Sequence, residues 1–512
     1  MTVLDPLEPN LDPALAALAD AVLIPPFPGL TAPRWLLRAL SRGLAGVTLF
    51  GSNVTGDTSS LTATLRAAAS LEPVIAIDEE GGDVTRVAYA AGSPYPGNAA
   101  LGAVDDVALT RSVYSAIGAD LARLGINVDL APCADVLAPG GSPVVGTRSF
   151  GAAPALVARH AAAAVSGLQA AGVAACAKHF PGHGAAGEDS HRSLATVAGT
   201  LDDVRRRDLP PFAAAIAAGS VAIMPGHLRV PELTGALPAT LSPAAVTGLL
   251  RGELGFDGVV ICDALEMKAA SAAFGIPEAA VLAVLAGVDL LCLGRDTDEA
   301  MYHAVRAALA GAVTAGRLDG ARLEEAAHRV AGLRGRLAGY RASGSGSGSG
   351  SGAAFRTGAG DSGGAGAGPG VGLTAARRAL RRSGPAPGAL AGPLVVELEP
   401  AENIAAGRFT WGFEPWAATL RVDPGGSQDG SAVDLVLRAS AGRALVLAVR
   451  DGRAVAGLLG AVLAARPDTV VVEMGVPAWV PPPGTAYLAT YGASRVCAQA
   501  AAEALGLVPQ AG

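Results

Sequence analysis

The chain has 512 residues, of which 51% are apolar and only 16% are charged, and its formal net charge is −7. This length predicts two domains, and the apolar fraction predicts large buried layers. The acidic balance argues against nucleic acid as a main partner. The basic residues are scattered, and the densest group, Arg377-Arg378 with Arg381-Arg382, is interpreted as one solvated helix face.

Targeting and membrane-spanning patterns are not found in the sequence. Met1–Pro6 contains no positive region followed by an apolar stretch, and no apolar run reaches the roughly 20 residues that span a bilayer. The cysteines are odd in number and widely spaced, so we interpret them as buried free thiols. We therefore expect a cytoplasmic protein without a membrane partner. The five cysteines are Cys133, Cys176, Cys262, Cys292 and Cys497.

Short apolar runs alternate with longer Ala- and Leu-rich helical stretches through the first two thirds of the chain. The runs lack a period of two, as expected for strands that are covered on both faces. Eight β-then-α units predict an α/β fold, with a (β/α)8 TIM barrel over residues 1–341. A doubly wound open sheet is the alternative. The predicted strands cover residues 20–25, 45–50, 73–78, 126–131, 173–178, 219–224, 257–262 and 288–293.

A Gly-Ser repeat and a Gly/Ala-rich tail occupy residues 342–372, and this composition predicts a flexible linker. Residues 373–512 contain further apolar runs at 393–398, 432–437, 444–449 and 469–474, which predict a smaller α/β sandwich domain. This second domain offers no catalytic candidate. Its tryptophans, Trp411, Trp416 and Trp479, are interpreted as core or domain-interface residues.

Polar residues gather where the predicted barrel strands end. Because the carboxyl ends of barrel strands open onto one face, these side chains are expected to lie near one another. The residues concerned are Asp78, Asp129, Asp135, Lys178, His179, His227 and Asp263.

The densest group of such residues lies in the motif Lys178–Gly184. His179 and His183 have the i, i+4 spacing that can bind zinc on a helix, but Pro181 and Gly182 between them break a helix, so we expect no metal. Lys178 is costly to bury unless it meets acceptors, and sugar hydroxyls or a nearby carboxylate such as Asp78 would serve.

Asp189 and His191 follow, separated by one residue. On an extended loop their side chains point the same way, so the carboxylate can accept the imidazole N–H, fix its tautomer and raise its pKa. His191 is then a candidate proton donor and acceptor near neutral pH. A solvent-exposed turn is the competing interpretation.

Asp263 stands at the end of a strongly apolar strand within Gly255–Met267. A carboxylate there is either the N-cap of the helix that follows or a nucleophile facing the barrel mouth. The second interpretation gains weight if another acid/base group lies on a neighbouring strand.

These motifs together resemble glycoside hydrolase family 3, specifically its bacterial β-N-acetylglucosaminidase branch. Further matching pieces appear in the family's order over nearly all of residues 15–340: Ile77–Gly82 with Arg86, Gly125–Asp135, Pro143–Gly151 and Pro238–Ser242. The resemblance implies a retaining mechanism with a covalent glycosyl-enzyme and no cofactor. It makes Asp263 the nucleophile and His191 the acid/base, tuned by Asp189. It assigns sugar binding to Asp78, Arg86, Arg148, Lys178 and His179, with His227 as a further neighbour.

The resemblance predicts an exo-acting β-N-acetylglucosaminidase acting on muropeptides or chitin-derived oligosaccharides. An imidazole acid/base repels an anion less than a second carboxylate would, so inorganic phosphate could replace water and give a phosphorylase. A non-catalytic sugar-binding barrel is the third hypothesis. Two positions depart from the family pattern, since Glu79 stands where Gln is usual and Ala264 replaces a second aspartate. Neither change touches Asp78 or Asp263, so they put the rate in doubt more than the reaction type.

Overall fold

The computed structural model describes residues 11–140, 142, 144–187, 193–344, 370–387, 390, 392–399, 403–407, 409–424 and 431–507. The chain divides into two compact units, and each draws on several stretches of sequence. The first unit comprises residues 1–79, 110–145 and 152–362, and the second comprises 80–109, 146–151 and 363–512. Most of the predicted linker lies outside the described residues.

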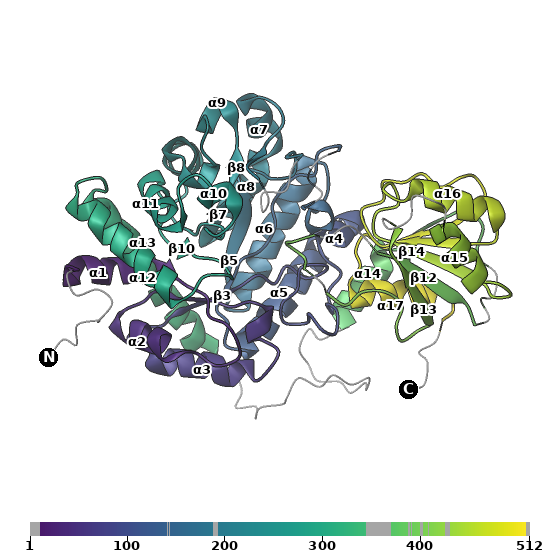
Figure 1. Ribbon diagram of the computed structural model, residues 1–512, viewed down its shortest axis with the longest axis horizontal. Coiled ribbons are helices and arrows are strands. Elements are labelled where there is room, and N and C mark those ends of the chain that lie inside the picture. The colour runs from purple at the N-terminus through teal and green to yellow at the C-terminus, as the bar shows by residue number, and fades with distance from the viewer. Residues whose placement is uncertain are drawn as a thin grey trace. The chain divides into compact units, whose positions relative to one another are not determined.

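A six-stranded parallel sheet that curls into a half-barrel forms the centre of the first unit (Figure 1). Its strand order is β2-β3-β4-β5-β7-β9, and β1 pairs in parallel with β10. Each of the eight predicted strands overlaps one of these observed strands, and β5 and β7 extend past their predicted ends. Their bounds are β1 Leu23–Ile24, β2 Gly46–Thr48, β3 Val74–Ile77, β4 Val128–Asp129, β5 Ala174–Phe180, β7 Ala222–Pro225, β9 Val259–Val260 and β10 Leu291–Cys292.

Helices follow the strands and cover them, as the alternating sequence pattern predicts. The strands are buried along their whole length, which explains why their sequences are continuous apolar runs. Strands β6 (Ala195–Thr196) and β8 (Leu228–Arg229) form a separate two-stranded parallel sheet. The longer helices of this unit are α1 Pro13–Asp20, α2 Arg34–Arg42, α3 Thr58–Ala68, α5 Val107–Arg123, α6 Pro154–Ala170, α8 Leu209–Ala217, α11 Ile276–Ala286, α12 Glu299–Thr314 and α13 Gly320–Gly344.

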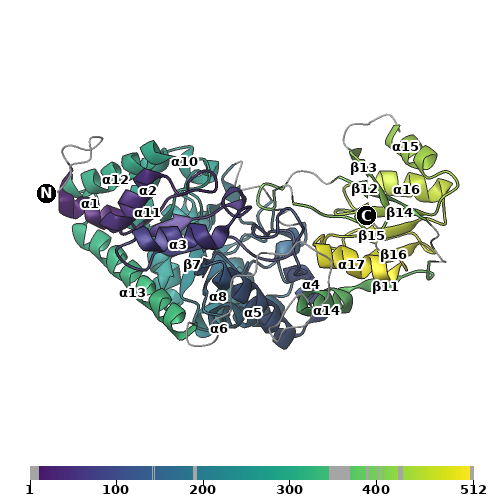
Figure 2. The same ribbon diagram turned by 90° about the horizontal axis from the view of Figure 1, so that it is seen from below.

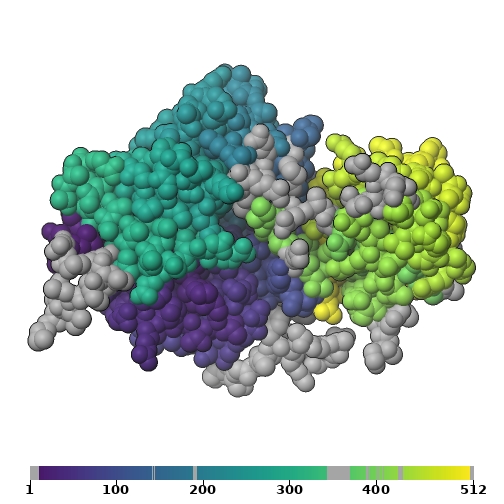
Figure 3. Space-filling view, viewed as in Figure 1, coloured from purple at the N-terminus to yellow at the C-terminus, as the bar shows by residue number. Residues whose placement is uncertain are grey.

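The ends of these helices are fixed by local chemistry. Asp12 and Asp57 accept backbone N–H groups as N-caps of α1 and α3, and Gly43 and Gly287 end α2 and α11 in the left-handed conformation. Helices from the two ends of the unit meet, because α1 packs against α12 and α13. The purple and green surfaces adjoin accordingly in Figure 3.

The second unit contains a six-stranded sheet of order β11-β16-β15-β14-β12-β13, in which only β11 is antiparallel. Alternate strand residues divide between two buried clusters, so the sheet has two apolar faces. Val395 and Val446 belong to one cluster with α17, whereas Val396 and Leu447 belong to the other with α15 and α16. The bounds are β11 Arg381–Ser383, β12 Leu394–Leu398, β13 Ala418–Val422, β14 Leu445–Val449, β15 Val470–Glu473, β16 Ala486–Ala489, α15 Ser431–Ala439, α16 Ala456–Ala465 and α17 Arg495–Ala504.

One predicted strand of this region is wrong. Residues 432–437 form part of helix α15, because Ala432 and Val436, four residues apart, are the buried positions while Leu435 is exposed. The apolar run is therefore one face of an amphipathic helix. Strands β13 and β16 were not predicted.

Two stretches of the N-terminal half belong to this second unit. Helix α4 (Asn98–Val104) packs against α14 (Gly370–Ala379), which in turn packs against α17; Figure 2 shows the three helices together. A 3-10 turn at Gly146–Arg148 contacts α4. The second unit therefore contains residues from both sides of the predicted boundary near residue 341.

Within the described residues, no single helix has both the length and the apolar composition to cross a membrane. The pair Pro231–Leu241 and Ala244–Glu253, bent by 98°, meets both criteria only when the two pieces are taken together.

Candidate active site

A buried ion pair lies at the carboxyl ends of β3 and β5. Lys178 Nζ donates to Asp78 Oδ1 at 2.5 Å, and the side chains are 3% and 23% exposed. Asp78 follows the last residue of β3, and Lys178 lies within β5, so two parallel strands bring them to the same edge of the sheet. The carboxylate supplies the acceptor that a buried ammonium requires. Of the two kinds of acceptor expected for Lys178, sugar hydroxyls or a carboxylate such as Asp78, the structure shows the carboxylate.

Asp263 lies three residues beyond β9, at the same edge of the sheet, and is half-buried. It is not a helix N-cap, because the next helix begins at Lys268 with Met267 at its N-cap position. Asp263 Oδ1 instead accepts from the N–H of Ala264 at 2.8 Å. Burial raises the pKa of the Cys292 thiol to about 12, and the carboxylates of Asp263 and Asp78 add to the shift, so both lie within electrostatic reach of this one thiol.

His227 is fully buried and contacts Ala264, the residue directly after Asp263. The separation between its Nε2 and the carbonyl oxygen of Ala264 is 3.0 Å, and since a carbonyl only accepts, Nε2 donates. His227 therefore holds the backbone directly after Asp263. Ala264, the departure from the family pattern, takes part in this contact through its main chain, which any residue at that position would provide.

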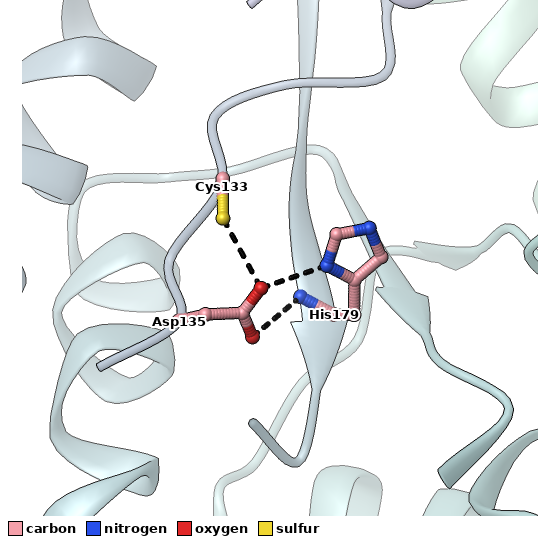
Figure 4. A group of neighbouring side chains, drawn as sticks. All are labelled: Cys133, Asp135 and His179. Atoms are coloured by element: carbon pink, nitrogen blue, oxygen red, sulfur yellow. Dashed lines mark hydrogen bonds and ion pairs between the residues drawn. The ribbon is translucent and has the colours of Figure 1, made fainter. Parts of the chain in front are cut away.

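A second buried group surrounds Asp135 (Figure 4). The segment after β4 continues alongside β5, where Cys133 forms a parallel bridge with Lys178. This pairing brings the Asp135 side chain within hydrogen-bond distance of His179. Asp135 Oδ2 lies 2.8 Å from His179 Nδ1 and 3.1 Å from Cys133 Sγ, while Oδ1 accepts the N–H of His183 at 2.7 Å and of His179 at 3.2 Å.

These contacts determine which nitrogen of His179 carries a proton. Burial alone would raise the pKa of Asp135, but the imidazoles of His179 and His183 and their hydrogen bonds outweigh it and lower the pKa. Asp135 is thus ionised near neutral pH and can only accept, so Nδ1 of His179 donates to it. When the imidazole is neutral, Nε2 is the nitrogen without a proton and is a hydrogen-bond acceptor.

Cys133, Asp135 and His179 together have the composition of a metal site. Their geometry fits hydrogen bonds better. A tetrahedral zinc ion would hold an imidazole nitrogen and a carboxylate oxygen roughly 3.4 Å apart, whereas Nδ1 and Oδ2 are 2.8 Å apart. The rings of His179 and His183, the two histidines with i, i+4 spacing, have centroids 5.8 Å apart and meet edge-on.

Asp129, at the end of β4, is a buried acid of another kind. Burial raises its pKa well above the usual value, and the nearby carboxylates of Glu79 and Asp78 contribute to the shift. Its Oδ1 accepts from Glu79 N at 3.0 Å, and Oδ2 has no hydrogen-bond partner in the described part of the chain. The Asp129 carboxyl, whose raised pKa favours the protonated form, accepts from the main chain directly after Asp78.

The other two predicted sugar-binding residues lie in the second unit. Arg148 forms a bidentate ion pair with Glu80, with Nε and Nη2 at 2.8 and 2.7 Å from the two carboxylate oxygens. Arg86 is half-buried and donates from Nη2 to the carbonyl oxygen of Ala405 at 2.8 Å. Glu80 was not singled out from the sequence, although its position two residues after Asp78 is a usable signal.

Asp189 and His191 lie outside the described residues. Their predicted roles as acid/base and tuning carboxylate remain predictions. Asp135 was recognised from the sequence only as a strand-end acid. Its partners were not, because they depend on how residues 131–134 pair with β5.

Comparison with known proteins gives the family. Residues 38–333, more than half of the chain, match the pattern described as the glycosyl hydrolase family 3 N-terminal domain. The beta-hexosaminidase A of Pseudoalteromonas piscicida is 36% identical over 341 residues, which cover 61% of this chain and 57% of that protein. The beta-hexosaminidase of Stenotrophomonas maltophilia (strain R551-3) is 38% identical over 272 residues, covering 51% of this chain and 80% of that protein. The solved structure of a glycoside hydrolase family 3 beta-N-acetylglucosaminidase from Paenibacillus sp. str. FPU-7 is 31% identical, covers 96% of both chains and has a TM-score of 0.82. The chain belongs to glycoside hydrolase family 3.

Proposed function

We propose that this protein is an exo-acting, retaining β-N-acetylglucosaminidase that releases terminal β-linked GlcNAc. The observation that carries the proposal is the buried Lys178–Asp78 pair, at the same edge of the parallel sheet as Asp263. The names of the relatives support the substrate class, and muropeptides or chitin-derived oligosaccharides are the proposed source of the sugar.

The proposal includes a closed (β/α)8 barrel as the frame of the site. Main-chain hydrogen bonds support closure on both sides of β1. Leu23 and Ile24 pair with β10, and on the other side Thr48 N donates to Pro25 O at 3.3 Å. A parallel bridge between Ile261 and Leu290 supports a connection from β9 towards β10.

In the proposed mechanism, an oxygen of Asp263 bonds to the anomeric carbon as the bond from that carbon to the leaving oxygen breaks. His191, tuned by Asp189, gives its proton to the leaving oxygen and then takes one from the incoming water. Two inversions at the anomeric carbon give net retention. Asp78, Lys178 and His179 would bind hydroxyls of the sugar, and the family resemblance assigns the same role to Arg86 and Arg148.

Trapping of the intermediate tests the nucleophile. A 5-fluoro analogue of an activated β-GlcNAc donor should label a peptide within residues 255–267, and a label elsewhere would contradict the assignment. Asp263→Ala should lose on the order of 5 kcal/mol of transition-state stabilisation, roughly 5,000-fold in kcat. Azide should partly restore its turnover by forming the α-glycosyl azide. Asp257→Ala, an exposed acid just before the same strand, is the matched control and should retain activity.

Product analysis with and without inorganic phosphate tests the acceptor. Hydrolysis predicts free GlcNAc under both conditions. GlcNAc-1-phosphate as the main product would replace the hydrolase assignment with a phosphorylase while leaving Asp263 as the nucleophile.

A further inference from the structure

A single buried carboxylate ties a segment of the N-terminal half to the C-terminal sheet within the second unit. Asp83 Oδ2 accepts from Arg450 Nη2 at 2.7 Å and from Thr147 Oγ1 at 2.9 Å, and Oδ1 accepts from Ala493 N at 2.9 Å. Asp83 comes three residues before one predicted sugar-binding arginine, and Thr147 comes directly before the other. The carboxylate therefore joins the immediate neighbours of both arginines to the same point of the sheet domain.

Arg450 is itself held firmly by the sheet domain. It follows the last residue of β14, its side chain is only 14% exposed, and its guanidinium lies 4.8 Å from the ring centroid of Phe409 and 6.0 Å from that of Trp411. Aromatic faces stabilise a guanidinium and restrict its plane. Arg450 thus presents a fixed donor to Asp83 rather than a mobile surface charge.

Contacts on the other side of Arg86 continue this anchoring. Thr410 N donates to Tyr89 O at 3.2 Å, and Thr410 Oγ1 donates to Ala90 O at 2.8 Å. Val84 belongs to the buried cluster that contains Val395 and Phe413 of the sheet domain. Segment 83–90 is therefore held at both ends by residues beyond 390, and Arg86 between them donates to the carbonyl oxygen of Ala405.

The segment that carries Arg148 is joined to the same support. Asn98 Nδ2 donates to the carbonyl oxygen of Arg148 at 2.7 Å. Glu80 accepts both Nε and Nη2 of Arg148, which fixes the plane of the guanidinium. The side chain and the main chain of Arg148 both depend on residues 80–98.

We propose that the C-terminal sheet domain is the support that sets the positions of Arg86 and Arg148 for substrate binding, and that Asp83 and Arg450 are its principal positioning residues. The inference rests on the proposed function, in which the two arginines bind hydroxyls of the terminal sugar. Hydrogen-bond donors lose much of their effect when they are displaced by about 1 Å. The domain would therefore act on substrate affinity.

The test uses the full chain and variants at Arg450. Arg450→Met removes the charge but keeps much of the side-chain volume, and Arg450→Lys restores a cation that can reach Asp83. Arg466→Met is the matched control, because Arg466 hydrogen-bonds Ser440, Arg443 and Asp468 within the sheet domain. We expect the KM for 4-nitrophenyl β-GlcNAc to rise at least tenfold in Arg450→Met with kcat within threefold of wild type. The lysine variant should return KM to within threefold, and the control should leave it unchanged.

Hydrogen exchange gives a readout that does not depend on activity. Peptides covering 80–90 and 146–151 should take up deuterium faster in Arg450→Met but not in Arg466→Met. A folded Arg450→Met with wild-type KM and wild-type exchange would overturn the proposal, and if that variant does not fold, Asp83→Asn is measured in the same way. A wild-type chain that does not release GlcNAc would instead refute the proposed function, while the exchange result would still decide whether the sheet domain supports the two segments.

Discussion

The tautomer of His179 provides the sharpest test of the first unit, through the substitution Asp135→Asn. In the wild type, Oδ1 accepts two main-chain N–H groups and Oδ2 accepts from Nδ1 of His179 and from Cys133. An asparagine can keep the main-chain contacts only if its carbonyl oxygen takes the place of Oδ1. Its NH2 group then faces Nδ1, which must give up its proton to accept a hydrogen bond. The proton moves to Nε2, and the lone pair offered to the substrate is lost.

The size of the effect follows from the contacts that change. The three N–H hydrogen bonds to the ionised carboxylate, worth about 1.5–3 kcal/mol each, become neutral ones worth about 1 kcal/mol, so stability should fall by about 1.5–6 kcal/mol. Loss of one neutral hydrogen bond to the sugar, at about 0.5–1.5 kcal/mol, should lower kcat/KM by about 2- to 13-fold.

Two assays separate these effects. The free energy of unfolding comes from denaturant titration, and 15N chemical shifts of the imidazole report which nitrogen of His179 is protonated. Cys133→Ala is the control, since it removes one contact of Asp135 without changing the proton on the imidazole. If Asp135→Asn lost stability as expected but kept wild-type kcat/KM and the Nδ1–H tautomer, the reasoning would be refuted.

Three further changes test other parts of the first unit. The folded-state pKa of Asp129 is raised, so the stability contributed by its protonated form is complete below about pH 3.8 and is lost as the pH rises towards the folded pKa. The free energy of unfolding of Asp129→Asn should therefore increase relative to that of the wild type by about 1.4 kcal/mol for each pH unit in that interval. An identical pH dependence of the two free energies from pH 4 to 8 would contradict this. Lys178→Met should lower kcat/KM by about 10- to 150-fold through loss of a charge-assisted hydrogen bond. Lys268→Met, at an exposed position, should leave kcat/KM unchanged. A wild-type kcat/KM in Lys178→Met would show that Lys178 does not bind the substrate. A methyl group at Gly184 would lie 1.9 Å from a main-chain oxygen, and one at Gly187 would meet nothing within 4 Å; calorimetry should show Gly184→Ala destabilised by about 1–3 kcal/mol and Gly187→Ala little changed.

The sequence predicts the parallel sheet well for a physical reason. A strand covered on both faces must be apolar throughout, and such runs are visible without knowledge of their neighbours. The same reasoning places Asp78 and Lys178 at one edge, where the structure joins them. The reasoning fails at residues 432–437, which form a helix. Only the spacing of the buried residues distinguishes a helix from a strand there, and the run is too short to show a period.

Contacts between distant residues that do not both lie at the ends of neighbouring strands could not be predicted. Asp83 and Arg450 are 367 residues apart, and neither has a local pattern that identifies the other. The bond between Asp135 and His179 depends on the pairing of residues 131–134 with β5, which is set by the fold as a whole. The hydrogen bonds that position the site are therefore less visible in the sequence than the strands that carry it.

The order in which the second unit is assembled has a consequence for biosynthesis. Its residues come from three stretches, and the last of these begins only at residue 363. A ribosome releases residues 80–109 and 146–151 long before the sheet against which they pack. Val84 and Asp83 therefore stay exposed to solvent until their partners in the sheet have been translated. The contacts of Asp83 with Arg450 and Ala493 can therefore form only after the C-terminal sheet has been translated.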